Sequence, residues 1–264
     1  MRVVDLDRDM RDVIPTGTSV DSEFLFDRMT RCTLEAASAR GARRILDVAS
    51  GFGQDARALA TDGAFAVGAE PSARMSALAR MQDDASGAPR VVHVRAWGDA
   101  LPFADGSFDA VFCKGALDHF DTPLAAIGEM ARVTRSEGRV VLAIANFDSL
   151  SCRVARGVDA VREDWLGRTP SRGRRHYDVP HDHFTRYELD LMREQASAHL
   201  TIEAVRGLSL AWGLPAWSRA VSRLPRFAAQ ATLEAFDGVA RALPALADVV
   251  VLWGRPRRSA TTSA

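Results

Sequence analysis

The sequence predicts an α/β fold: a single, doubly wound, mostly parallel seven-stranded sheet, its last strand antiparallel, with helices on both faces and an insertion or lid over the C-terminal ends of the strands. Three observations predict it. From about residue 44, short β-branched apolar runs alternate with stretches of helical period, as in βαβ units. A glycine-rich turn follows the first run, as in strand-to-helix connections of such sheets. The 264 residues, 47% hydrophobic, suffice for one core.

The elements are expected in alternating order. Strands are predicted over residues 44–48, 64–70, 91–95, 108–113, 140–144, 200–205 and 248–253. Helices are predicted over 54–60, 72–82, 122–133 and 185–197. Ser72 and Thr122 are expected to cap their helices, with Pro123 in the first turn. Thr185 and Glu188 have the spacing of a capping box.

The chain divides into five parts along its length. We expect an N-terminal helical cap over residues 1–40, including an amphipathic helix over 21–39, and a cofactor-binding core over 41–146. Residues 147–184, rich in Arg, Gly and Pro, are expected to form the insertion or lid. Residues 185–254 are expected to complete the sheet and supply acceptor-pocket helices, and 255–264 to form a frayed tail.

Composition argues against several classes of partner. Basic and acidic residues balance at 34 each, so no overall field attracts nucleic acid or anionic lipid. The acidic N-terminus is unlike a signal peptide, and no apolar run is long enough to cross a bilayer. Cys32, Cys113 and Cys152 match no metal-ligand spacing. We expect a cytoplasmic protein that acts on a small molecule, without nucleic acid or a membrane span.

The strongest motif runs from Ile45 to Gly53, where a strand enters a turn whose glycines let a ligand approach the backbone. The next predicted strand ends in Glu70. A carboxylate at that position can accept hydrogen bonds from both hydroxyls of a ribose. The alternative without a ligand is a tight structural turn, followed by a carboxylate that happens to end the next strand.

A nicotinamide dinucleotide site is the main alternative, because Gly51-x-Gly53-x-x-Ala56 is an acceptable variant of that fingerprint. Asp47 argues against it. A carboxylate at the end of the first strand would repel a pyrophosphate, whereas it suits a cationic amino-acid group. The turn therefore favours a sulfonium amino acid as its ligand.

A third segment, from Gly98 to Val111, carries a specific resemblance. With Glu129 to Val133 and Gly138 to Leu142, it resembles the class I, seven-stranded S-adenosylmethionine-dependent methyltransferases, in particular the family that includes the ubiquinone and menaquinone biosynthesis methyltransferases. The resemblance covers about Ile45 to Asn146. It implies S-adenosyl-L-methionine as the cofactor.

The resemblance also implies roles for individual residues. Glu70 would hold the ribose, Asp99 the adenine amino group and the Ala100 amide a ring nitrogen, while Met75 would pack against adenine. The other residues assigned to the cofactor are Asp47, Ala49, Ser50, Gly51, Gly53, Pro71 and Lys114. Ala49 stands where the family usually has its first glycine. We expect Ala49 at negative φ, which would tighten the turn without closing the site.

The acceptor side is predicted from the segment Lys114 to Asp121, which the resemblance places beside the transferable methyl group. His119 can take a proton from an attacking hydroxyl; equally, it can shape the pocket or anchor its loop. Related quinone-pathway O-methyltransferases have Glu-x-x-Glu-His here, which binds a divalent metal in some of them. This chain has Gly115-x-x-Asp118-His119 and lacks the first acid, so we expect a site without metal, with a divalent metal as a minor alternative.

Tyr177 and His183 are the other candidate catalytic residues, as lid residues that enter the acceptor pocket. They belong to a cluster with His176 and His181 for which zinc is a minor alternative and ordinary lid packing the main one. The arginines of the insertion are read as solvated rather than as a phosphate or carboxylate site; they are Arg168, Arg172, Arg174 and Arg175. Core packing is expected for Trp212, Trp217 and Phe227 more than lining of an acceptor pocket.

Together these features predict methyl transfer from a sulfonium to a small-molecule acceptor by in-line displacement. Such a reaction needs orientation in a water-poor pocket and no covalent nucleophile. O-methylation is slightly favoured over C- or N-methylation, because His119 offers a base. The alternatives are an NAD(P)-dependent oxidoreductase and a non-catalytic protein that binds S-adenosylmethionine.

Overall fold

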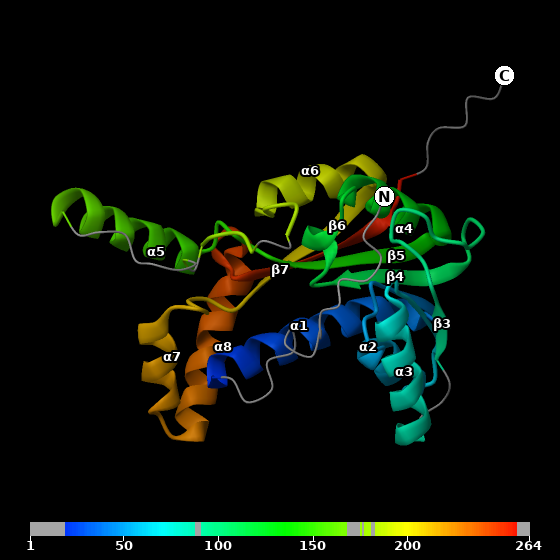
Figure 1. Ribbon diagram of the computed structural model, residues 1–264, viewed down its shortest axis with the longest axis horizontal. Coiled ribbons are helices and arrows are strands. Elements are labelled where there is room, and N and C mark those ends of the chain that lie inside the picture. Colours follow the sequence, from blue (N-terminus) through cyan, green and yellow to red (C-terminus); the bar gives the residue numbers. More distant parts are fainter. Residues whose placement is uncertain (1–18, 88–90, 168–174, 176, 181–182, 258–264) are drawn as a thin grey trace.

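The computed structural model describes residues 19–87, 91–167, 175, 177–180 and 183–257. Its seven strands form one sheet in the order β3-β2-β1-β4-β5-β7-β6 (Figure 1). They are β1 (Arg44–Val48), β2 (Phe65–Ala69), β3 (Val92–Val94), β4 (Phe108–Lys114), β5 (Thr134–Ala145), β6 (Leu200–Leu208) and β7 (Val249–Pro256). The first five pair in parallel, and β7 is antiparallel to both β5 and β6. The expected doubly wound sheet is confirmed.

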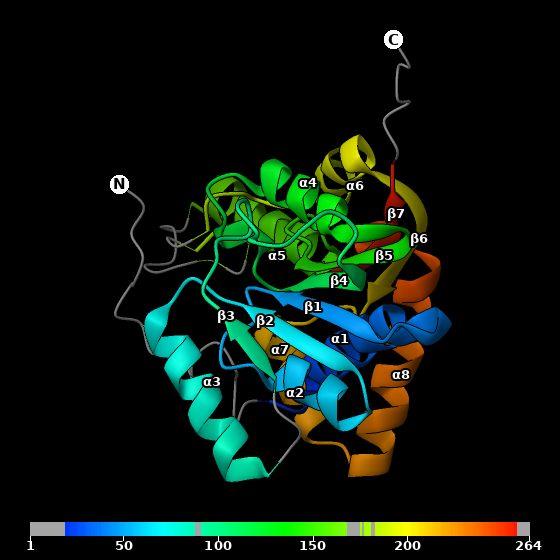
Figure 2. The ribbon, with the colours of Figure 1, turned by 90° about the vertical axis from the view of Figure 1, so that its right-hand side faces the viewer.

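Eight α-helices accompany the sheet in the described part of the chain. They are α1 (Val20–Ser38), α2 (Gln54–Thr61), α3 (Ala73–Ser86), α4 (Pro123–Val133), α5 (Leu150–Ala160), α6 (Leu189–His199), α7 (Pro215–Ser222) and α8 (Arg226–Ala242). Figure 2 shows α4 and α6 on one face of the sheet and α1, α2, α3 and α8 on the other. The described helices include none with the length and apolar character that a bilayer crossing requires.

The core forms because the central strands are apolar on both faces. Leu46 and Val48 of β1 pack with Ile127 of α4 in one cluster. Ile45 packs with Leu25 of α1 on the opposite face. Neighbouring strand residues point to opposite faces, so a continuous apolar run of this kind predicts a strand covered on both sides. The order of the strands then brings the carboxyl ends of β1, β2 and β4 to one edge.

Most predicted boundaries agree with the structure to within a few residues. The exceptions are the start of β5, which is Thr134 instead of residue 140, and the start of α6. The α6 helix begins at Leu189, and Glu188 is its N-cap. The expected capping box does not form there, because the Thr185 amide instead donates to the Asp118 carbonyl. Thr122 does cap α4 in position, yet its side chain makes no capping hydrogen bond. Its hydroxyl donates to the carboxylate of Asp99, and a charged acceptor gives the stronger bond.

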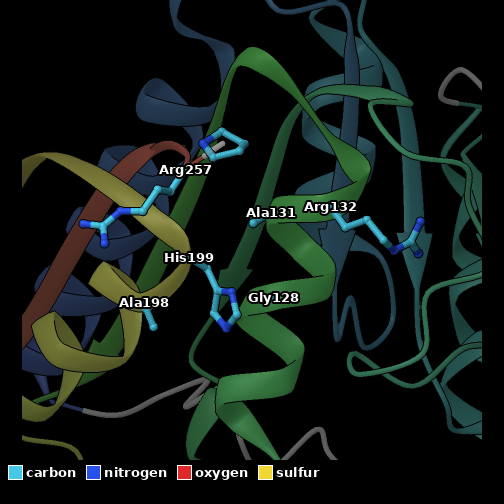
Figure 3. Close-up of a pocket in the computed structure, with 7 residues that line it drawn as sticks. Gly128, Ala131, Arg132, Ala198, His199 and Arg257 are labelled. Carbon is cyan, nitrogen blue, oxygen red and sulfur yellow. The ribbon is translucent and has the colours of Figure 1, made fainter. Parts of the chain in front are cut away.

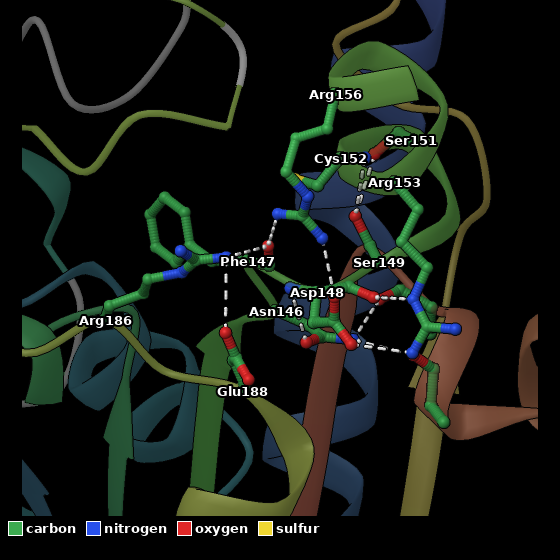
Figure 4. Close-up of polar contacts among 12 residues, drawn as sticks. Asn146, Phe147, Asp148, Ser149, Ser151, Cys152, Arg153, Arg156, Arg186 and Glu188 are labelled. Atoms are coloured by element: carbon green, nitrogen blue, oxygen red, sulfur yellow. Dashed lines mark hydrogen bonds and ion pairs between the residues drawn. The ribbon is translucent and has the colours of Figure 1, made fainter. Parts of the chain in front are cut away.

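The insertion contains a helix that the sequence pattern did not reveal. Ser149 caps α5 by accepting a hydrogen bond from the Cys152 amide, and a π-helical segment, Val161–Trp165, follows. Polar contacts at the base of α5 join the helix to the segment just before it (Figure 4): Asp148 accepts from Arg153 and Arg156. Figure 1 shows α5 extending outward from the sheet.

The three aromatic residues weighed for the acceptor pocket have different environments. Trp212 packs against the core that includes α1, and its indole donates to Ser22. Trp217 packs in a small cluster with Phe24. These two confirm the expected core packing, whereas Phe227 is 79% exposed, so the prediction of core packing was wrong for it.

Candidate active site

The turn after β1 combines three residues in the left-handed region of backbone space. Ala49, Gly51 and Gly53 have φ of 60°, 53° and 74°. The negative φ that we expected for Ala49 is wrong. Its amide and that of Ser50 both donate to the Ala69 carbonyl, at 2.8 and 3.2 Å, which forces the chain to turn immediately after the strand. A non-glycine residue in this conformation is strained.

Glu70 joins this turn to the following helix. One carboxylate oxygen accepts from the Gly51 amide and the other from the Ser72 amide, each at 2.9 Å. Ser72 in turn caps α3 by accepting from the Met75 amide at 3.2 Å. The two backbone amides therefore set the orientation of the Glu70 carboxylate.

Asp47 is a buried carboxylate beside the turn, only 4% exposed. Burial raises its pKa well above the usual range, and the nearby charges of Asp55 and Glu70 raise it further, although Lys114 opposes them. The lysine is itself engaged: its Nζ lies 2.6 Å from Asp55 and donates to Thr30 at 2.7 Å. A site with more buried negative than positive charge suits a cationic ligand.

A network that sequence reasoning missed supports the turn from behind. Arg57 donates to the Phe52 carbonyl at 3.0 Å and pairs with Asp83, which also contacts His93 at 2.8 Å. The His93 ring occupies the space next to Gly53, where an added Cβ would lie 2.8 Å from its Cε1. No sequence motif links these residues, because they come from α2, α3 and β3.

Ser50, Met75 and Pro71 complete the predicted cofactor residues near the turn. The Ser50 hydroxyl is buried against β2, where a Cβ at Gly68 would lie 2.6 Å from it, so Ser50 presents its backbone to the edge. Met75 is buried, and its Cε would lie 3.6 Å from a Cβ at Gly51. The Pro71 carbonyl accepts from Arg95. These residues therefore surround the turn.

Asp99 and Ala100 lie in the loop after β3, with Phe120 beside them. Thr122 donates to Asp99, and the Phe120 ring lies so close to Gly98 that a Cβ there would be 2.4 Å from it. The Ala100 amide donates to the Trp97 carbonyl at 3.1 Å. Contact between this amide and an adenine nitrogen would require that hydrogen bond to be exchanged or shared.

The structure brings His119 and His183 together around Asp118. Their rings are 4.3 Å apart between centroids, and Nδ1 of His183 lies 2.8 Å from the Asp118 carboxylate. The amides of Phe184 and Thr185 donate to the Asp118 carbonyl, which attaches the end of the insertion to the loop after β4. Both histidines were predicted for the acceptor pocket, but their direct contact was not, since the two segments are far apart along the chain.

Tyr177 has a different environment from the two histidines. Its hydroxyl donates to Asp159 of α5 at 3.1 Å and accepts from Arg175 at 2.6 Å. Arg175 also pairs with Glu163, so this arginine is bound within the insertion rather than simply solvated. These contacts bind the Tyr177 hydroxyl within the insertion. His176, His181, Arg168, Arg172 and Arg174 lie outside the described residues.

A hollow of about 250 Å³ lies elsewhere on the molecule (Figure 3). It is lined by Gly128, Ala131 and Arg132 of α4, by Ala198 and His199 of α6, and by Pro256 and Arg257. These residues lie where α4 and α6 end, at the edge opposite the carboxyl ends of the parallel strands. Ligands of open α/β sheets bind at the carboxyl ends, so the candidate site is the edge at Asp47 and Glu70.

Comparison with known proteins identifies the central part of the chain. Residues 46–142 match a family model described as a methyltransferase domain. A demethylmenaquinone methyltransferase of Beutenbergia cavernae is 40% identical over 113 residues, which cover 43% of this chain and 45% of that protein. The matched region thus spans less than half of the relative. The match confirms the methyltransferase resemblance for this part of the sequence.

Solved structures agree with the fold over most of the chain. The YcgJ protein of Bacillus subtilis has 17% sequence identity and a TM-score of 0.56, covering 88% of this chain and 99% of that one. The [4+2]-cyclase SpnF has 21% identity and a TM-score of 0.58, covering 88% and 81%. At these identities the likeness concerns the fold, which is that of class I methyltransferases. Because one of these structures is named as a cyclase, the fold by itself does not specify one reaction.

Proposed function

We propose, starting from the methyltransferase domain that residues 46–142 form, that the chain transfers the methyl group of S-adenosylmethionine to a small-molecule acceptor. The observation that carries this proposal is the set of carboxylates around the turn. Glu70 is bound by the Gly51 amide, Asp47 is buried near the carboxylates of Asp55 and Glu70, and Asp99 follows the next strand.

The residues at this edge fit the cofactor by their chemistry. Glu70 would accept hydrogen bonds from the ribose hydroxyls, because a carboxylate oxygen can accept more than one hydrogen bond. Asp99 would accept from the adenine amino group. Burial and the neighbouring carboxylates raise the pKa of Asp47, and the ammonium of the methionine group would favour its charged form. Gly51 and Gly53 leave the backbone open to that group.

When bound, the cofactor supplies an electrophilic methyl group on a sulfonium. The protein's task is to hold the acceptor in line with it and to exclude water. For the acceptor we propose a molecule with a reacting hydroxyl, so that the reaction is an O-methylation. Its support is the cluster of Asp118 and His119, in the loop after β4, with His183, which can assist the loss of the hydroxyl proton.

Tyr177 has less support as a catalytic residue. Its hydroxyl is already bound by Arg175 and Asp159, which would have to release it before it could contact an acceptor. We therefore place the acceptor chemistry at His119 and His183, and assign Tyr177 to the packing of the insertion.

Calorimetry with S-adenosylhomocysteine and with NADH tests the cofactor. We expect binding of S-adenosylhomocysteine alone, since a pyrophosphate would be repelled by Asp47. Glu70→Gln and Asp99→Ala should each weaken that binding at least about tenfold, because each removes a charge-assisted hydrogen bond. Glu137→Gln, at an exposed side chain of β5, is the matched control. Unchanged affinity in both site variants would refute the assignment.

A second experiment separates an enzyme from an inert binder. Transfer of an isotopically labelled methyl group is measured to a panel of phenols, enols and amines. Labelled product from the hydroxyl compounds is the expected result. Tight cofactor binding without any transfer, or transfer to amines alone, would contradict the proposal of O-methylation.

A further inference from the structure

The side chains of Asp118, His119 and His183 form a compact group of metal-ligating atoms. One donor atom from each residue lies within 4.8 Å of the other two. Asp118 and His119 belong to the loop after β4, and His183 comes from the end of the insertion. Two imidazoles and one carboxylate are the donor set that several divalent transition ions use.

Asp118 is poorly compensated where it lies. Its side chain is 4% exposed, and within the described residues its ion-pair partners are the two imidazoles alone, with no lysine or arginine. One of its carboxylate oxygens, Oδ1, is buried and accepts no hydrogen bond in the described part of the chain. Burying a carboxylate oxygen without a hydrogen-bond partner costs free energy. A cation bound beside Asp118 would offset that cost.

The contact between Asp118 and His183 has an unusual geometry. Nδ1 of His183 approaches Oδ2 to 2.8 Å, yet this nitrogen has no partner with hydrogen-bond geometry. Two ligands bound to one ion at about 2.1 Å, roughly 90–110° apart, lie about 3.0–3.4 Å from each other. The two atoms are therefore close to the spacing of neighbouring ligands.

His119 needs only a small movement to join them. Its Nε2 lies 3.9 Å from Oδ1 of Asp118, about 0.5–1 Å longer than the spacing of ligands on a common ion. The His119 side chain is 26% exposed, which leaves room for this adjustment. By contrast, the pair of His93 and Asp83 is well aligned as a hydrogen bond at 2.8 Å and needs no ion.

The backbone keeps the three ligands together. The Asp118 carbonyl accepts from the amides of Phe184 and Thr185 at 2.8 and 3.2 Å, so His183 is anchored next to Asp118. The ring of Phe147 meets the His183 ring edge-on and restricts its orientation. Ligands held in this way before an ion arrives lose little entropy on binding.

The expectation from the missing first acid of the Gly115-x-x-Asp118-His119 motif disfavours a metal, but His183 of the insertion adds a third donor to Asp118 and His119. We propose that Asp118, His119 and His183 bind a divalent transition-metal ion of the Zn²⁺ or Co²⁺ type. A three-residue site leaves positions open for a further ligand. If the proposed O-methylation is correct, that ligand is the reacting oxygen of a phenol or enol acceptor. Coordination lowers the pKa of the bound hydroxyl, so its proton leaves to solvent before methyl transfer. This use of the ion depends on the proposed function, but binding of the ion does not.

The test is a titration of the full chain, without a polyhistidine tag and stripped of metal by a chelator, with Co²⁺. The visible d–d absorption of Co²⁺ reports nitrogen and oxygen ligands directly and needs neither cofactor nor acceptor. We expect saturation at one ion per chain, and competition by Zn²⁺. His183→Gln, His119→Gln and Asp118→Asn should each weaken Co²⁺ binding at least about tenfold.

His199→Gln is the matched control, because His199 lies beside the hollow at the opposite edge of the sheet; it should leave the titration unchanged. Circular dichroism verifies that each variant is folded. If Asp118→Asn does not fold, Co²⁺ binding by the two histidine variants still tests the proposed site. Absence of a Co²⁺ spectrum in the native chain, or equal binding by native chain and both histidine variants, would overturn the proposal. Co²⁺ binding without methyl transfer would instead contradict only the proposed function.

Discussion

Gly51 donates its backbone N–H to the Glu70 carboxylate at 2.9 Å, and this hydrogen bond makes the turn after β1 and the end of β2 a single unit. The carboxylate would otherwise be free to rotate. Because the amide of Ser72 binds its other oxygen, the side chain is held before any ligand arrives. Preorganisation of this kind lowers the entropy that ligand binding has to overcome. The turn's conformation is therefore part of the site, which makes its residues the first to test.

Ala49→Gly should stabilise the protein. Ala49 has φ of 60°, a conformation that costs an L-residue about 1 kcal/mol more than glycine. Part of this gain is cancelled by the greater freedom of glycine in the unfolded chain, so we expect the free energy of unfolding to rise by about 0.5 kcal/mol in urea titrations. Ala58→Gly, at an exposed position within α2, is the control and should lose about 1 kcal/mol. Equal losses in both variants would show that the turn carries no strain.

The sequence predicted the central strands well and the site only in part. Residues 44–48 were predicted as a strand and are one, because an apolar run between Arg and a glycine turn has few alternatives. The φ of Ala49 was mispredicted, since it depends on two amides meeting the Ala69 carbonyl. The proximity of His183 to Asp118 depends on where the insertion returns to the sheet. Such contacts between distant segments have no local sequence signal.

Asp237→Asn should strongly destabilise the packing of α1 on α8. The Asp237 side chain is 1% exposed and pairs with Arg28 of α1 at 2.8 Å and with Arg241 at 2.9 Å. Its other oxygen accepts from the Ser209 amide. Removing one partner of a buried ion pair costs about 3–5 kcal/mol; because Arg241 is half exposed, we expect about 2–4 kcal/mol in urea titrations.

Asp27→Asn provides the control for that measurement on the same helix. Asp27 pairs with Arg31, and both side chains are more than half exposed. An exposed pair contributes about 0–1 kcal/mol. A loss at Asp237 no larger than that at Asp27 would mean that the buried pair does not stabilise the contact.

The stability of the protein should increase between pH 7 and pH 5 through Asp248. Burial raises the pKa of this carboxyl to about 6, although hydrogen bonds from the Trp212 amide and Ser151 oppose the shift. The folded state therefore holds a proton that the unfolded chain, with a pKa near 3.9, releases. Stability consequently rises as the pH falls through 6, by about 1 kcal/mol at pH 5.

Asp248→Asn isolates that contribution, because the variant cannot titrate at this position while other groups, such as Asp47, still do. Urea titrations at pH 7 and pH 5 should show a smaller increase for the variant, by about 1 kcal/mol. The same increase in both proteins would assign the pH dependence to other groups.

Gly53→Ala should destabilise the protein for two reasons that a second substitution can separate. Its φ of 74° is unfavourable for alanine, and the new Cβ would lie 2.8 Å from Cε1 of His93. We expect a loss of about 2–3 kcal/mol, of which about 1 kcal/mol comes from the backbone and the rest from the steric overlap. In a His93→Ala background the overlap disappears, so the same glycine substitution should cost only about 1 kcal/mol. The difference between the two backgrounds is the coupling free energy of a double-mutant cycle, read from urea titrations of the four proteins. A coupling near zero would mean that the His93 ring moves aside easily, and that the backbone conformation alone requires glycine at position 53.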